Sequence, residues 1–131
     1  LKPQFTGCTI HHITPKIDAG EIIHQTGPEM QKGDNLQVFS CRTLKRGFHD
    51  LKFLIKFYLD GNQIECYPQK RTGKLWQNKD WTPFHLELIY DLYNDSIVDY
   101  YLDGKLESTE PNIITNKIFR QINPDNNNLK C

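Results

Sequence analysis

Asp18 is the residue of this chain whose position best suits chemistry. It lies between two segments that read as strands, residues 8–13 and 21–26. Pro15 stops the first strand, and Gly20 permits a backbone conformation that most residues avoid. Ligands of open α/β folds bind just past strand ends, so Asp18 is expected at a functional turn. The competing interpretation is a turn aspartate that caps its own loop.

Imidazole and thiol side chains gather around the same loop, at Cys8, His11, His12 and His24. Neighbouring strand positions face opposite sides of a sheet, and no second spaced pair completes a tetrahedral set. We therefore expect no metal site. His11 is a further candidate for the functional site, with a backbone-bonded sheet histidine as the alternative. His12 faces the other way and is expected to be structural.

The bulk composition indicates one small α/β or α+β domain of 131 residues. Lys and Arg number 16, as do Asp and Glu, so no net charge draws the chain to nucleic acid or an anionic membrane. No apolar run reaches the roughly 20 residues of a membrane span, and we expect no signal peptide, because the opening residues lack its pattern. The four cysteines lie far apart without a CxxC pair, which is typical of reduced thiols in a cytoplasmic protein.

A long helix, from residue 36 to about 58, is the element most clearly predicted. Asp34 is the expected N-cap, Gly61 the expected stop, and Gly47 marks an expected bend. Apolar positions recur at helical spacing: Leu44, Phe48, Leu51, Ile55 and Tyr58. A wetter stripe runs beside them: Lys45, His49, Lys52 and Lys56. This stripe is expected to be a solvated face, with a phosphate or RNA contact as the lesser alternative.

Shorter elements follow this helix. Residues 63–67 alternate as a third strand, and a second helix is expected to begin at residues 82–83, with a proline in its first position. Residues 96–102 read as a short helix or strand. The Asn-rich residues 120–131 are expected to form a poorly ordered tail.

The sequences Gly-Cys-Thr-Ile-His (7–11) and Ile-Asp-Ala-Gly-Glu-Ile-Ile-His-Gln (17–25) fit the pattern G-x-T-[VI]-H … D-x-G-x-[IV]-[IV]-x-Q. This pattern resembles a segment of the formyltetrahydrofolate-dependent formyltransferases, and further motifs follow in the order of that family. Lys-Gly-Asp at 32–34 resembles the x-G-D before the family's last helix, and residues 48–61 resemble that helix. The match runs over residues 6–67 and is most similar to the glycinamide ribonucleotide formyltransferases.

The resemblance implies an α/β fold in two parts. Residues 1–68 would form the C-terminal half of a doubly wound, Rossmann-like formyltransferase sheet, and residues 69–131 a small helical extension. Half of such a sheet leaves one edge unpaired, which suits a homodimer or another association through that edge.

The resemblance also implies a function: formyl transfer from 10-formyltetrahydrofolate to a small amine, as in phosphoribosylglycinamide formyltransferase of purine biosynthesis. In the family, the aspartate that matches Asp18 orders a water and assists proton transfer. The loop around it lines the pterin pocket, which assigns cofactor contacts to Ile13, Thr14, Pro15, Lys16, Ile17, Ala19 and Gly20.

Departures from the family keep two alternatives open. The N-x-H-P motif, with the family's catalytic asparagine and histidine, does not occur in these residues, so a non-catalytic module is one alternative. Residues 73–76 and 81–83 look like an appendage of amino-sugar relatives, so a nucleotide-sugar amine N-formyltransferase is the other. Methionyl-tRNA is the weakest acceptor, because the chain has no net positive charge.

Overall fold

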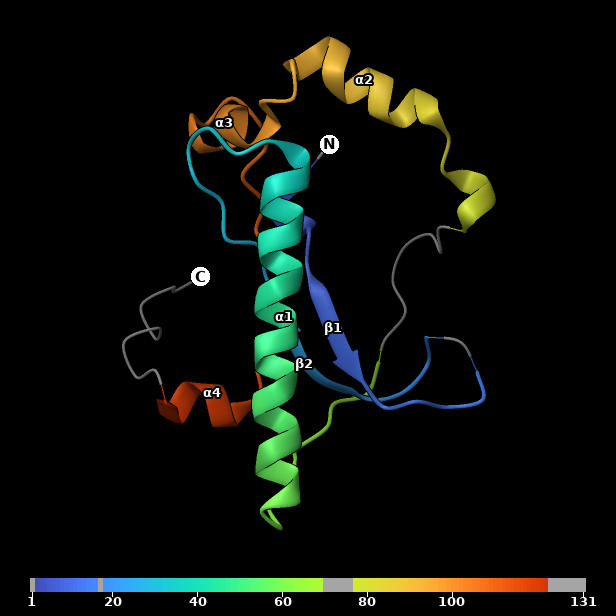
Figure 1. Ribbon diagram of the computed structural model, residues 1–131, viewed down its shortest axis with the longest axis vertical. Helices are drawn as coiled ribbons and strands as arrows, with labels where there is room; N and C mark the ends of the chain where they lie inside the picture. The colour runs from blue at the N-terminus through green and yellow to red at the C-terminus, as the bar shows by residue number, and fades with distance from the viewer. Residues whose placement is uncertain (1, 17, 70–76, 123–131) are drawn as a thin grey trace.

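The chain forms a mixed α/β structure in the computed structural model, which describes residues 2–16, 18–69 and 77–122 (Figure 1). Its elements, in order, are η1 (Pro3–Phe5), β1 (Cys8–His11), β2 (Ile22–Thr26), α1 (Leu36–Leu59), η2 (Asn78–Asp80), α2 (Pro83–Tyr93), α3 (Ile97–Leu102) and α4 (Lys117–Ile122). No helix of these described segments combines the length and apolarity that crossing a bilayer requires.

The two strands pair antiparallel, with Cys8 opposite Thr26 and an irregularity of the ladder between Ile10 and His11. The third strand predicted at residues 63–67 is wrong. Only Tyr67 pairs with β2, through two backbone hydrogen bonds to Ile22 of 2.7 and 2.8 Å. The segment before it is held by side chains instead, which removes backbone groups from any ladder.

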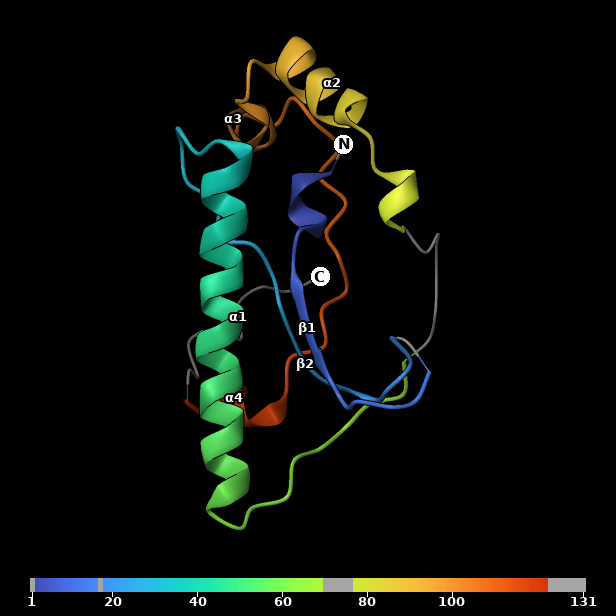
Figure 2. The ribbon, with the colours of Figure 1, turned by 45° about the vertical axis from the view of Figure 1, so that its right-hand side comes forward.

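Helix α1 lies along one side of the strands (Figure 2) and confirms the predicted long helix. The predicted N-cap was one residue early, since it is Asn35 whose side chain accepts a hydrogen bond from the Val38 N–H at 2.8 Å. The predicted bend at Gly47 is also wrong. The helix continues through this buried residue, where a Cβ would lie 2.9 Å from the Cβ of Cys8, so the glycine serves close packing on β1.

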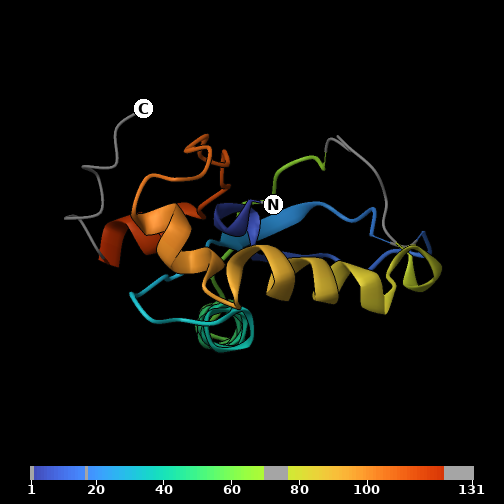
Figure 3. The same ribbon diagram turned by 90° about the horizontal axis from the view of Figure 1, so that it is seen from above.

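An apolar stripe on a helix usually marks the face turned to the core. On α1 the apolar stripe and the buried face are different. The buried face consists of Phe39, Thr43, Gly47, Asp50 and Leu54. The periodic apolar positions lie outside: Leu44, Phe48, Ile55 and Tyr58 are all more than half exposed. Seen along α1, the rest of the described chain lies to one side of the helix (Figure 3). A two-stranded sheet covers only one helix face.

A small apolar core joins α1 to α3, through the buried side chains of Phe39, Ile97 and Val98. The segment at residues 96–102, predicted as a helix or a strand, forms helix α3 from Ile97 to Leu102, and α2 begins at Pro83 as predicted. Of the poorly ordered tail expected at residues 120–131, residues 120–122 complete α4 and residues 123–131 lie outside the described part of the chain.

The segment between α3 and α4 runs back beside the strands (Figure 2). The Gln4 amide donates to the carbonyls of Glu107 and Thr109 at 2.9 and 3.0 Å. Further along, the Gln25 N–H donates to the Ile114 carbonyl at 2.8 Å. This return covers the edge of β2 that faces away from β1.

Candidate functional site

The loop between β1 and β2 brings His11 and Asp18 together. Nε2 of His11 lies 4.0 Å from Oδ1 of Asp18, and their side chains are 27% and 60% exposed. Asp18 has a φ of 48°, in the left-handed region that aspartate visits more readily than most residues. Nδ1 of His11 donates to the His12 carbonyl at 2.9 Å, which turns Nε2 toward the carboxylate. The pair therefore presents a reachable carboxylate beside an oriented imidazole.

Gly20 closes the base of this loop by close approach. The φ of Gly20 is not positive, so the prediction that this residue adopts a conformation that most residues avoid is wrong. A Cβ at this buried position would lie 1.7 Å from the carbonyl oxygen of His12, which no side chain permits. The His12 N–H donates to the Glu21 carbonyl at 3.0 Å and completes the closure.

Most of the other residues assigned to the pterin pocket are exposed to solvent. Ile13 is 97% exposed, Pro15 is exposed, and the Thr14 hydroxyl donates to the Lys16 carbonyl at 2.8 Å. Ala19 is half-buried, and the assignment of residue 17 falls outside the described residues. Hollows of about 620 and 220 Å³ lie away from this loop, one beside the end of α1 and the other at the start of β1.

His12 joins the loop to the segment after α1. Its Nε2 lies 3.1 Å from Sγ of Cys66. Burial, followed by the charges of Glu21 and Glu65, raises the pKa of the Cys66 thiol, which keeps its proton and donates it to the Ile64 carbonyl at 3.5 Å. The contact between His12 and Cys66 fits the structural role expected of His12.

A buried polar network under the sheet was not predicted. Nε2 of His24 lies 3.3 Å from Oδ2 of Asp50, and the Thr26 hydroxyl donates to the same oxygen at 2.7 Å. Nδ1 of His24 accepts from the Asn116 N–H at 3.2 Å, so Nε2 carries the proton of a neutral ring. Burial lowers the pKa of His24, against the opposing pull of Asp50. Alternation along β2 places His24 and Thr26 on one face, but their partners come from distant segments.

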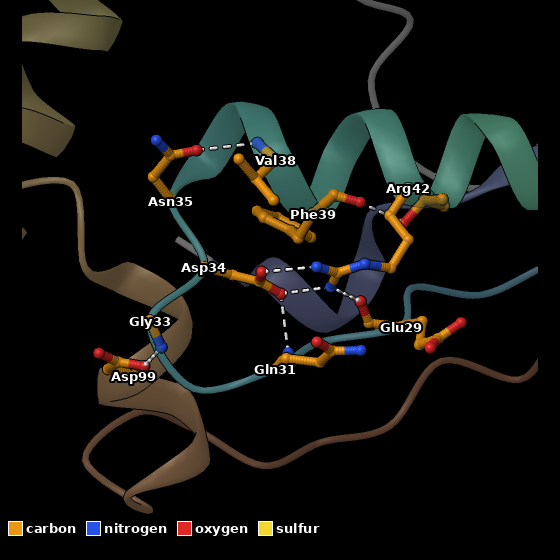
Figure 4. A network of polar contacts seen from close by, with 10 residues as sticks. Glu29, Gln31, Gly33, Asp34, Asn35, Val38, Phe39, Arg42 and Asp99 are labelled. Atoms are coloured by element: carbon orange, nitrogen blue, oxygen red, sulfur yellow. Dashed lines mark hydrogen bonds and ion pairs between the residues drawn. The ribbon is translucent and has the colours of Figure 1, made fainter.

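A second network fixes the start of α1 (Figure 4). Arg42 donates to both carboxylate oxygens of Asp34, at 2.6 and 2.8 Å, and to the Glu29 carbonyl at 3.0 Å. The Gln31 N–H donates to the same carboxylate at 2.7 Å. The Arg42 guanidinium holds the pKa of Asp34 below its usual value. Asp34, expected as a cap, instead pins the loop before α1 to the second turn of the helix.

No three His, Cys, Asp or Glu side chains of residues 2–16, 18–69 and 77–122 gather as a metal site. Comparison of the chain with models of known families, with curated proteins and with solved structures finds no match.

Proposed function

We propose that this chain takes part in formyl transfer from 10-formyltetrahydrofolate to a small amine, with the loop at residues 13–20 facing the donor. The observation that carries the proposal is the approach of His11 to Asp18 over 4.0 Å at the end of β1. It is supported by the ordered resemblance of residues 6–67 to the formyltransferases.

The transfer needs a carboxylate of this kind. The amine nitrogen attacks the formyl carbon and forms a new C–N bond and an oxyanion. The bond from that carbon to N10 of the folate then breaks, and the proton of the amine ends on N10. A positioned carboxylate that accepts and relays this proton lowers the barrier, and a hydrogen-bond donor stabilises the oxyanion. Asp18, whose side chain is 60% exposed, suits the relay.

His11 and Asp18 together suit the binding of a water. A separation of 4.0 Å is too long for a direct hydrogen bond. Because Nδ1 of His11 donates to the His12 carbonyl, a neutral ring leaves Nε2 as an acceptor that faces an acceptor. A water between the two donates one hydrogen bond to each, and the amine proton is relayed through this water. His11 is thus proposed to position this water.

The acceptor in this proposal is an amine-bearing small molecule, in the first place glycinamide ribonucleotide and alternatively a nucleotide-linked amino sugar. Cys8, Cys41 and Cys66 are free thiols, which fits a cytoplasmic setting for the folate chemistry.

A non-catalytic module is the second candidate. It is favoured by the lack of an N-x-H-P sequence among the 131 residues, since the family places its catalytic asparagine and histidine there. Such a module would bind the folate at the loop of residues 13–20 without catalysing formyl transfer.

A titration of the chain with a stable 10-formylfolate analogue, followed by amide NMR, tests the loop assignment. The proposal predicts shifts concentrated in residues 11–21 that are absent in the Asp18→Ala variant and retained in the Asp60→Ala control. Asp60 is equally a surface aspartate but lies at the far end of α1. Shifts centred on another part of the chain, or none at millimolar analogue, contradict it.

A further inference from the structure

Helix α1 carries an outer apolar stripe, which we define as Leu44, Phe48, Ile55, Tyr58 and Leu59. Their exposed fractions are 52, 64, 51, 65 and 76%. From first to last, these positions span about 22 Å of helix, at 1.5 Å per residue. Single exposed apolar residues are ordinary on protein surfaces, but a continuous stripe of this length marks an interaction surface.

The outer apolar stripe has a basic border. Lys45, Lys52 and Lys56 are exposed and lie along one side of the stripe at helical spacing. His49 lies on the same side with its side chain 82% exposed. The surface of α1 is therefore apolar along its middle and positive along one border.

Helix α2 presents the complementary pattern. Phe84, Leu88 and Leu92 follow one another at four-residue spacing and are 65, 37 and 56% exposed. Glu87 and Asp91 are exposed and border this row on one side. The acidic border of α2 is thus complementary in charge to the basic border of α1.

We propose that two copies of this chain associate. In the pair, the apolar row of α2 in each copy, with its acidic border, packs on the outer apolar stripe of α1 in the other. Helix α2 lies beyond the N-terminal end of α1, whereas the stripe runs toward its C-terminal end (Figures 1 and 2). An antiparallel arrangement of two copies brings these regions together twice. Such a twofold contact is closed and self-complementary.

A second copy accounts for more of the surface than a lipid bilayer would. An anionic membrane suits a basic amphipathic helix such as α1, but it repels Glu87 and Asp91 and leaves the row on α2 uncovered. A second copy covers both rows and pairs both borders.

Sedimentation velocity of the purified chain over a range of concentrations tests the proposal. We expect a reversible dimer that weakens with added salt and is lost in Phe48→Glu and in Leu88→Glu. Lys52→Glu and Glu87→Lys should each weaken dimerisation about tenfold or more, and the double variant should recover most of the loss, because both contacts are then reversed in charge.

Lys16→Glu, on an exposed loop away from both helices, is the matched charge control and should leave the dimer unchanged. Circular dichroism confirms that each variant is folded. The proposal is overturned by a monomer at all concentrations, by a dimer that survives Phe48→Glu, or by a monomer that binds anionic phosphatidylserine vesicles through Phe48.

Discussion

Nε2 of His24 lies 3.3 Å from Oδ2 of Asp50, and this buried pair joins strand β2 to helix α1. His24 is 4% exposed and its ring stacks on Phe119, with centroids 4.3 Å apart. The ring accepts one hydrogen bond and donates another, so it is satisfied only in its neutral form. The fold beneath the candidate loop is therefore sensitive to protonation.

The first prediction concerns pH. Because burial lowers the pKa of His24 in the folded chain, the unfolded chain binds the proton more readily. The free energy of unfolding should therefore fall as pH drops below about 6.5, by no more than about 1.4 kcal/mol per pH unit for one proton. Urea unfolding between neutral pH and about pH 5 measures this slope.

His24→Gln should flatten that slope, since Gln does not titrate. His49→Gln is the matched control, because His49 lies 3.8 Å from the same Asp50 carboxylate but is 82% exposed. An equal flattening in both variants would assign the pH dependence to surface charge instead.

The second prediction concerns Asn116, which is 1% exposed. Its amide donates to the carbonyls of Ile23 and Glu65, at 3.0 and 2.9 Å, and so ties β2 to the segment after α1. Asn116→Ala leaves both carbonyls without this donor and should lower the unfolding free energy by about 2–4 kcal/mol. Asn112→Ala, at an exposed position, should change it by less than about 0.5 kcal/mol in the same denaturation experiment.

The third prediction separates the two polar residues at the start of α1. Asn35→Ala removes one cap and should cost about 1 kcal/mol. Asp34→Ala should lower the free energy of unfolding by more, because it removes the carboxylate that accepts from the Arg42 guanidinium and the Gln31 N–H. The pKa of Asp34 is lowered by folding, so its contribution is present above pH 4 and is lost as pH falls further. Equal cost for the two variants at neutral pH would argue against the Asp34–Arg42 brace.

The fourth prediction concerns Gly20. Gly20→Ala places a Cβ where the His12 carbonyl lies and should lower the midpoint of thermal unfolding or prevent closure of the loop. Gly104→Ala is the control: it has a φ of 71° and nothing within 4 Å of the added Cβ, so it should cost only about 1 kcal/mol of strain. A milder effect at Gly20 than at Gly104 would refute the close approach.

Local signals predicted local structure well. The helical period gave α1, and a threonine followed by proline gave the start of α2, because both depend on neighbours in sequence. The facing of α1 was not predictable, since its outer side is as apolar as a core-facing side and only tertiary packing distinguishes them. The His24–Asp50 and Asn116 contacts join segments 26 to 93 residues apart, which no periodicity reports.

The candidate loop shows the same division. The strand, the loop and the second strand around Asp18 follow from alternation and turn residues. Three features of this loop were not predictable, because they accompany the irregular strand pairing at Ile10 and His11, which no sequence pattern indicates. They are the approach of His11 to Asp18, the role of Gly20 in closure and the His12–Cys66 contact.

Formyl transfer by the longest form of this protein that its gene encodes is the most direct test of the proposed activity. Mass spectrometry follows the formylation of candidate amines supplied with 10-formyltetrahydrofolate. We expect transfer by the unmodified protein, a loss of about 100-fold or more in Asp18→Asn with the fold intact, and normal transfer in Asp60→Asn. Transfer at an undiminished rate in Asp18→Asn, or none in the unmodified protein, would contradict it.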